Sequence, residues 1–156
     1  MLITARPAMQ LTSTAFRNDS TLPTDYTCKG KGISPPLAIN DVPSQAQSLA
    51  LVMHDPDAIG GRDFLHWAVW DIAPDVKEIA EGDLPPRAHQ GTNDYPGIGY
   101  GPACPPAGSG LHHYTFDLYA LDARIELPDG TDRQTLESII QDHTLTTATL
   151  VGTIQS

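Results

Sequence analysis

The sequence predicts a single, mainly β, loop-rich domain, and three observations support this fold class. Glycine contributes 13 and proline 14 of the 156 residues, a share that is high for a helical protein and too low for a low-complexity chain. Short apolar or alternating segments recur along the chain, whereas a helical spacing of apolar residues occurs once. A chain of this length can bury one sizeable core without disulfides or metals.

Four strands are expected in the first half of the chain. Weak alternation over residues 10–16 and an apolar stretch over residues 38–42 predict two of them. The continuous apolar run 48–53 predicts a central strand that is buried on both faces. Aromatic and β-branched residues predict a fourth strand over residues 64–72. The polar stretch 18–33 is expected to be a loop with at most one short strand.

The segment from residue 75 to residue 110 shows no convincing periodicity. Because structureless loops of this length are uncommon in compact domains, we expect short strands and turns within it, with residues 76–79 as one candidate. Residues 112–121 alternate more regularly than any other segment, so they predict the clearest strand of the chain.

One helix is expected, over residues 131–143. Its apolar residues Leu136, Ile139 and Ile140 have the i, i+3, i+4 spacing of one helix face, and polar residues before it can cap its first turn. The β-branched residues 144–154 predict a last strand after the helix.

The charge and hydropathy patterns exclude several functions. The formal net charge is -10 and the nine basic residues are scattered, so binding to nucleic acid is not expected. The sequence has no run of about 18 apolar residues, so no membrane span is expected. Residues 1–10 lack the apolar core of a signal peptide, which predicts a cytoplasmic protein. We expect residues 1–9 to be an N-terminal extension and residues 10–156 to form the domain.

Cys28 and Cys104 are the two cysteines of the chain. They are too few and too far apart for a zinc motif by themselves. In a reducing cytosol, they are expected to be reduced, half-buried thiols. A disulfide stays an open alternative, because bridging depends on whether the fold brings the two loops together.

Asp55, Asp57, His66 and His112 are the candidate site residues that the pattern itself suggests, because each lies near a loop rich in glycine or proline. Asp55 directly follows the buried run and precedes Pro56, so its carboxylate is held stiffly at a strand end. Imidazole N–H groups can donate to phosphate oxygens, and a carboxylate can orient an imidazole. The same carboxylate would repel a bare anion, so a zwitterion with an ammonium group fits better.

Strand alternation assigns faces to the two histidines. A period of two places His66 on the face of Phe64 and opposite Trp67, and it places His112 on the face of Tyr114. Purely structural roles stay open for these residues. A histidine in a strand is often a core residue whose hydrogen bonds are satisfied within the protein, and an aspartate before proline often forms a turn.

A metal site is the main alternative, and it would imply a metal-dependent hydrolase. Six side chains could ligate a divalent ion: His54, Asp55, Asp57, His66, His112 and His113. A calcium loop that starts at Asp55 fails, because His66 stands where a bidentate glutamate is needed. A catalytic zinc site lacks an HExxH-like pattern, so neither a metal nor another cofactor is expected.

Nucleophilic catalysis has little support in the sequence. Ser109 lies between two glycines but outside a G-x-S-x-G frame. Cys104 could pair with His112 or His113, although a buried thiol beside a pocket is the simpler interpretation. We therefore expect a binding protein rather than an enzyme.

Several motifs of the chain resemble those of the phosphatidylethanolamine-binding protein family, and more closely its bacterial Raf-kinase-inhibitor-like branch. They occur in order along nearly the whole chain, from about residue 10 to residue 154. The motifs are Ser34-Pro35-Pro36-Leu37, Ser48-Leu49-Ala50-Leu51, Asp55-Pro56-Asp57-Ala58, His66-Trp67 and the run from Gly101 to Tyr114.

This resemblance implies an antiparallel, Greek-key, β-sandwich-like domain with short peripheral helices. It also implies a small anion pocket for phosphate-bearing ligands such as a phospholipid head group, a nucleotide or a phosphorylated group. Carried over to this chain, the pocket residues are Asp55, Asp57, His66, Pro105, His112 and Tyr114, with Pro106 at the rim. The family further implies a protein kinase or a protease as a partner, and some of its bacterial members form homodimers.

Position 113 departs from the family pattern. The family often has arginine between the last histidine and tyrosine of the motif, where this chain has His113. If this side chain faces the ligand, anion binding should be weaker and more dependent on pH, because a neutral imidazole carries no permanent charge. If it faces away, the change has no consequence for the pocket.

Overall fold

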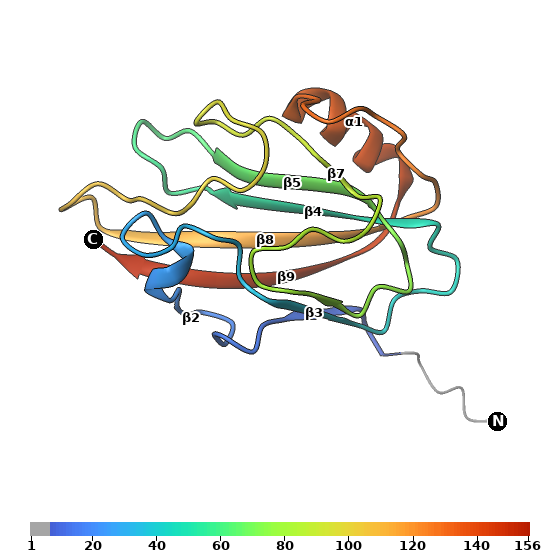
Figure 1. Ribbon diagram of the computed structural model, residues 1–156, viewed down its shortest axis with the longest axis horizontal. Coiled ribbons are helices and arrows are strands. Elements are labelled where there is room, and N and C mark those ends of the chain that lie inside the picture. The colour runs from blue at the N-terminus through green and yellow to red at the C-terminus, as the bar shows by residue number, and fades with distance from the viewer. Residues whose placement is uncertain (1–6) are drawn as a thin grey trace.

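The computed structural model describes residues 7–156, and strand β4 (Ser48–Asp55) lies at its centre (Figure 1). The other strands are β1 (Gln10–Thr12), β2 (Ser20–Thr21), β3 (Leu37–Asn40), β5 (Phe64–Ile72), β6 (Glu78–Ile79), β7 (His89–Gln90), β8 (Leu111–Leu121) and β9 (Thr144–Gln155). The helices are the α-helix α1 (Arg133–His143) and the short 3-10 helix η1 (Thr24–Tyr26).

The strands form two sheets that pack face to face. The large sheet has the order β2-β9-β8-β4-β5-β7, and the small sheet has the order β1-β3-β6. All neighbours are antiparallel except β2 and β9. Strands that are distant in the sequence, such as β4 and β8, therefore lie side by side, as a Greek-key arrangement requires. The predicted mainly β, sandwich-like fold with short peripheral helices is confirmed.

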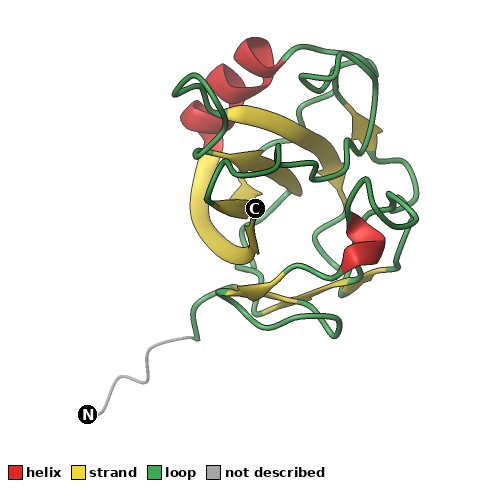
Figure 2. Ribbon diagram, turned by 90° about the vertical axis from the view of Figure 1, so that its left-hand side faces the viewer, coloured by secondary structure: helices red, strands yellow, loops and turns green. Residues whose placement is uncertain are grey.

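Strand β4 is buried on both faces, as its apolar run predicts. Leu49, Leu51 and Met53 point into the core between the two sheets, whereas Ala50 and Val52 belong to a second core beneath helix α1. Figure 2 shows this layering, with the helix on one side of the curved large sheet and the small sheet on the other. Alternate residues of the strand thus meet different layers.

Helix α1 begins two residues later than expected. The Asp132 carboxylate accepts a hydrogen bond from the backbone N–H of Thr135 over 2.8 Å, so Asp132 takes the N-cap position and the helix starts after it. Leu136 and Ile140, one turn apart, are its buried residues. They attach the helix to the outer face of the large sheet.

A β-bulge interrupts the pairing of β4 with β5 at His66. Met53 pairs with Trp67, and the next residue, His54, pairs with Leu65, so no residue lies opposite His66. The extra residue changes the faces along the strand: Leu65 packs beneath α1, whereas Trp67 lies in the core between the sheets. His66 still shares a side with Phe64, as expected, since both line one cavity. The expectation that it lies opposite Trp67 is wrong, because His66 turns toward the same side of the sheet as Trp67.

Strand boundaries agree with expectation in the large sheet and less well in the small one. β5 has the expected bounds, and β8 begins one residue before the expected strand. β1 is shorter than expected, because the Ser13 hydroxyl accepts the Ala15 N–H and the chain turns. Most of the expected extension, residues 1–9, lies outside the described residues, although Met9 is buried in the core. No helix within residues 7–156 is long and apolar enough to cross a membrane.

Cys28 and Cys104 form a disulfide, so the expectation of reduced thiols is wrong. The two residues are 76 positions apart in the sequence, with their Cα atoms 5.3 Å apart. The backbone brings the loops together, since the N–H of Cys28 donates to the carbonyl of Ala103 over 2.9 Å. The bridge joins the loop after η1 to the loop that precedes β8.

Candidate ligand-binding site

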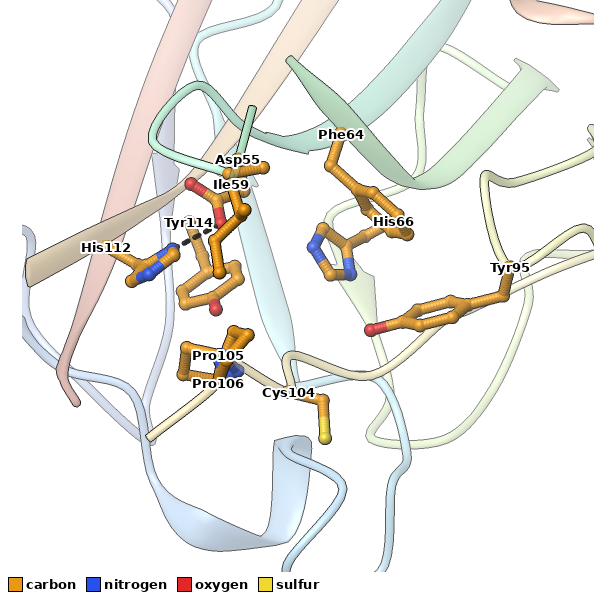
Figure 3. A pocket seen from close by; sticks show the side chains of 11 residues that line it. Asp55, Ile59, Phe64, His66, Tyr95, Cys104, Pro105, Pro106, His112 and Tyr114 are labelled. Atoms are coloured by element: carbon orange, nitrogen blue, oxygen red, sulfur yellow. Dashed lines mark hydrogen bonds and ion pairs between the residues drawn. The ribbon is translucent and has the colours of Figure 1, made fainter. Parts of the chain in front are cut away.

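A cavity of about 270 Å³ opens where β4 ends and β8 begins (Figure 3). Its lining residues are Asp55, Ala58, Ile59, Phe64, His66, Tyr95, Cys104, Pro105, Pro106, His112 and Tyr114. Five of the six expected site residues are among them, and Asp57 is not. The structure thus brings together residues from β4, β5, β8 and two loops. Asp55, His66 and His112 were suggested by the sequence pattern, whereas Pro105 and Tyr114 were expected from the family resemblance.

Asp55 and His112 form a buried pair in the cavity wall. His112 donates from Nδ1 to Asp55 over 2.7 Å, and the two side chains are only 2% and 5% exposed. The other oxygen of Asp55 accepts the backbone N–H of Asp57 over 2.8 Å. On the far side of the imidazole, Nε2 lies 2.8 Å from the Ser109 hydroxyl. Both nitrogens of His112 therefore have partners, and this ring offers a ligand no free N–H.

His66 differs from His112 because one of its nitrogens has no partner. Its Nδ1 donates to the carbonyl of Gly101 over 2.7 Å, and its backbone carbonyl accepts the N–H of Gly101, also over 2.7 Å. Burial lowers the pKa of His66, since only 3% of the residue is exposed. The ring is therefore neutral near pH 7, and Nε2 carries a lone pair. Figure 3 shows that this nitrogen points into the cavity, toward Tyr114 and Asp55.

Aromatic rings surround His66 on several sides. The centroid of its ring lies 4.8 Å from that of Phe64, 5.3 Å from that of Tyr114 and 5.7 Å from that of Tyr95. Phe64 and Tyr95 also contact each other edge to face at 4.9 Å. The Tyr95 hydroxyl donates to the carbonyl of Pro102 over 2.6 Å, which fixes this ring at the cavity mouth. The cavity wall is thus mainly aromatic, with few polar groups.

Gly101 allows these rings to pack closely. A Cβ atom at this position would lie 2.4 Å from the Tyr95 ring, which is closer than real contacts allow. Any side chain here would therefore displace Tyr95 from the cavity mouth. The glycine at the start of the 101–114 motif has a physical role in the shape of the cavity.

Asp57 lies beside the cavity and binds His113 instead of lining the wall. Its carboxylate accepts from the backbone N–H of His113 over 2.9 Å and from ring Nδ1 over 2.7 Å. Burial by itself raises the pKa of Asp57, but the hydrogen bonds from His113 outweigh it and lower this pKa. His113 is also absent from the lining, so its difference from the family's arginine does not remove a charge from the cavity wall.

Five lining residues were not among the expected pocket residues: Ala58, Ile59, Phe64, Tyr95 and Cys104. Phe64 carried a usable signal, because strand alternation already placed it on the face of His66. Tyr95 carried none, since it belongs to the segment 75–110 that has no periodicity. Its place depends on two-residue strands and turns that only the fold fixes.

The alternative chemistries find no support among the described residues. No group of three or more His, Cys, Asp or Glu side chains within residues 7–156 is arranged to hold a metal ion. Cys104 is bonded to Cys28, so it has no thiol to pair with His112.

Proteins of similar sequence and structure cover most of this chain. The UPF0098 protein of Chlamydia muridarum is 42% identical over 151 residues, which is 94% of this chain and 99% of that protein. Its counterpart from Pyrococcus abyssi is 42% identical over 147 residues, covering 90% and 82%. The crystal structure of the homologue CT736 from Chlamydia trachomatis matches with a TM-score of 0.89 at 40% identity, covering 96% of this chain and 98% of that one.

A further relative contradicts the expected cytoplasmic location. A Mycobacterium tuberculosis protein whose name describes it as a lipoprotein, LppC, is 38% identical over 151 residues, covering 97% of this chain and 74% of that protein. Prediction of the location from the missing apolar N-terminal run was therefore wrong. The disulfide weakens the same prediction, because such bonds persist mainly in oxidising compartments.

The family model of the phosphatidylethanolamine-binding proteins matches residues 12–155 of the chain. The crystal structure of Escherichia coli YbcL, described as a member of the mammalian family of these proteins, matches with a TM-score of 0.90 at 29% identity and covers 96% of this chain and 99% of that one. The fold, the sequence relatives and the family model agree, and the chain belongs to the phosphatidylethanolamine-binding protein family.

Proposed function

We propose that this protein binds a small phosphate-bearing zwitterion, of the phospholipid head-group class, in the cavity between β4, β5 and β8, and does not transform it. Membership of the family implies a binding protein. The single observation that carries the proposal is the convergence of Asp55, His66 and Tyr114 on one cavity of about 270 Å³. This volume is at the small end of ligand pockets, so it suits a head group better than a nucleotide.

The charge of the cavity favours a zwitterion over a bare phosphate. None of the described side chains that line it is lysine or arginine, and the Asp55 carboxylate is one of its walls. The chain as a whole carries a formal charge of -10. A ligand with an ammonium group beside its phosphate offsets these charges, whereas inorganic phosphate does not.

The proposal extends to a protein partner at the cavity mouth, a kinase or a protease, as the family resemblance implies. Two apolar side chains at the mouth, Ile59 and Tyr95, are 67% and 46% exposed. Exposed aromatic and aliphatic residues beside a polar pocket are typical of protein contact sites. Homodimer formation through the same surface belongs to this extension, and size-exclusion chromatography with light scattering checks it.

We also infer that the protein works in an oxidising compartment. The Cys28–Cys104 disulfide and the lipoprotein name of one relative support this location. Thiol labelling of freshly extracted protein tests it: blocked cysteines are expected, and two free thiols would contradict the inference.

Calorimetric titration with phosphorylethanolamine tests the binding function. The parent protein should bind it, and His66→Ala should bind about tenfold more weakly, because a hydrogen-bond partner at the cavity wall is lost. His143→Ala is the matched control, since His143 lies at the exposed end of α1 and pairs with Asp122. No binding to the parent protein, or equal binding by both variants, would refute this site.

A further inference from the structure

The Cys28–Cys104 disulfide lies at the protein surface, beside the ligand cavity. Both of its cysteines are exposed, although cysteine is among the residue types that are most often buried. Cys104 also lines the cavity, and Figure 3 shows it near Pro105 and Pro106, with its sulfur directed away from His66. An external thiol can therefore reach the bridge without entering the cavity and without unfolding the protein.

The segment around Cys104 is a thin wall between two cavities. A second cavity, of about 200 Å³, adjoins the first on the side of Leu22 and Ile154. Cys104 and Pro105 line both cavities. Residues between two cavities have packing partners on fewer sides than core residues have, so their position depends more on individual ties to the rest of the protein.

Few ties hold this wall in place. At its start, the buried residue Ala103 accepts the N–H of Cys28 over 2.9 Å. At its end, the carbonyl of Pro106 accepts the hydroxyl of Ser156. Pro105 and Pro106 have no backbone N–H, so neither can donate a hydrogen bond to a neighbouring segment. The disulfide is the covalent tie, and it joins the wall to the loop after η1.

We propose that this disulfide is an exchange site for an external dithiol, and that its reduction releases the wall of residues 103–106 and weakens ligand binding. This inference rests on the proposed function, because the wall belongs to the cavity that holds the ligand. Exposed disulfides are the ones that exchange readily. The second cavity gives a released wall room to move, and a wall that must be ordered again on binding lowers the affinity.

The exchange balances with the dithiol as the reductant. One thiolate of the dithiol attacks a sulfur of the bridge, the S–S bond breaks, and the other cysteine leaves as a thiolate that takes up a proton. The second thiol of the dithiol loses its proton and displaces the attacked cysteine, which is protonated in turn. Two electrons pass to the protein, which ends with two thiols, and the dithiol ends as a disulfide. The oxidised protein is then the binding form, in keeping with the proposed oxidising compartment.

Calorimetry with phosphorylethanolamine compares the oxidised parent, the parent reduced with dithiothreitol and the double variant Cys28→Ala/Cys104→Ala. The reduced parent and the variant should both bind about tenfold more weakly than the oxidised parent. Dithiothreitol should not change the affinity of the variant. Equal affinity of the oxidised and the reduced parent would overturn the switch.

Maleimide labelling tests whether a dithiol reaches the bridge in the folded protein. Mass spectrometry after treatment with dithiothreitol should count two labelled cysteines, while circular dichroism shows that the fold is kept. A bridge that is reduced only when the protein unfolds would overturn the exchange site.

Hydrogen exchange tests the release of the wall without a ligand. The N–H of Ser109 donates to the carbonyl of Pro106 over 3.1 Å, so its exchange rate reports movement at the end of the wall. Reduction of the parent should make this exchange about tenfold faster. An unchanged rate would contradict release of the wall.

Leu136→Ala is the matched control for stability. It removes a buried side chain of the core beneath α1, so it destabilises the protein without touching the wall. This variant should keep the affinity and the Ser109 exchange rate of the oxidised parent. If both change as they do on reduction, general loss of stability explains them, and the switch is refuted.

The outcomes separate the two proposals. If the oxidised parent binds phosphorylethanolamine and reduction changes neither the affinity nor the exchange at Ser109, the switch is refuted and the proposed function stands. If the oxidised parent does not bind, the proposed function is refuted, and control of binding by the bridge falls with it.

Discussion

His54 and Asp55 are neighbours in the sequence, yet each belongs to a different His–Asp cluster on opposite faces of the large sheet. On the cavity side, Asp55 pairs with His112, and both side chains are almost fully buried. On the helix side, His54 lies between two carboxylates, with Nδ1 2.7 Å from Asp63 and Nε2 2.9 Å from Asp117. The same pair of residue types therefore meets two very different environments.

The difference lies in the number of partners and in access to water. The inner pair has no second charged partner, so each member depends on the other. The outer cluster is shared, because Arg133 also binds Asp63 over 2.7 Å and Thr149 donates to Asp117 over 2.7 Å. Its side chains are 17% to 39% exposed, so water can replace a lost partner. Burial, more than the residue pair itself, decides how much each contact contributes to stability.

Removal of the inner carboxylate should have the largest effect. Asp55→Ala leaves His112 buried without its partner and should lower the free energy of unfolding by about 4 kcal/mol. In the outer cluster, Asp63→Ala should cost about 1 kcal/mol, because Asp117 still pairs with His54. Urea unfolding of both variants measures the contrast, and equal losses would contradict the role given to burial.

Loss of the disulfide should cause the second-largest loss of stability, because the bridge holds together only the two loops on the cavity side. The double variant Cys28→Ala/Cys104→Ala should be about 3 kcal/mol less stable than the parent, because the bridge closes a long loop. Thermal unfolding with and without reductant is the measurement. Reductant should lower the unfolding temperature of the parent protein but leave that of the double variant unchanged. An unfolding temperature of the parent that does not change with reductant would contradict the bridge.

His54 should contribute to stability in a pH-dependent way. Burial by itself lowers its pKa, but the hydrogen bonds that His54 donates to Asp117 and Asp63 outweigh it and raise the pKa above the ordinary value. A raised pKa in the folded state means that the stabilisation is complete below about pH 6.5 and is lost as the pH rises through the folded-state pKa. His54→Gln should therefore cost about 1–2 kcal/mol at pH 6 and clearly less at pH 9. Urea unfolding at the two pH values measures this loss. A loss in the free energy of unfolding at pH 9 that equals or exceeds the loss at pH 6 would contradict the role given to His54.

The exposed pair should have the smallest effect. Asp57 and His113 are 38% and 44% exposed, so Asp57→Asn should change the free energy of unfolding by about 0.5 kcal/mol or less. The same variant should leave the affinity for phosphorylethanolamine unchanged, because neither residue lines the cavity. A tenfold loss of affinity would instead assign Asp57 to the binding site.

Much of the large sheet could be read from the sequence, because its strands carry strong local patterns. β5 and β8 were predicted to within one residue, and the end of β4 located Asp55 correctly. The sequence did not predict the residues that form the β-bulge and the disulfide. The bulge at His66 is set by pairing with β4, and the Cys28–Cys104 bridge depends on loops that meet only in the folded chain. Tyr95 was missed for the same reason, since its position is fixed by its fit against Gly101.

The bulge frees position 66 from the demands of strand pairing. Because residue 66 has no partner on β4, its side chain can be substituted while Met53 still pairs with Trp67 and His54 with Leu65. An amide placed there could still donate to the Gly101 carbonyl and would face the same small cavity, so a single substitution could change which molecules bind. Deletion of His66 would instead disturb the fold. The preceding residues of β5 would shift by one position, and Leu65 would no longer pack in the core beneath α1.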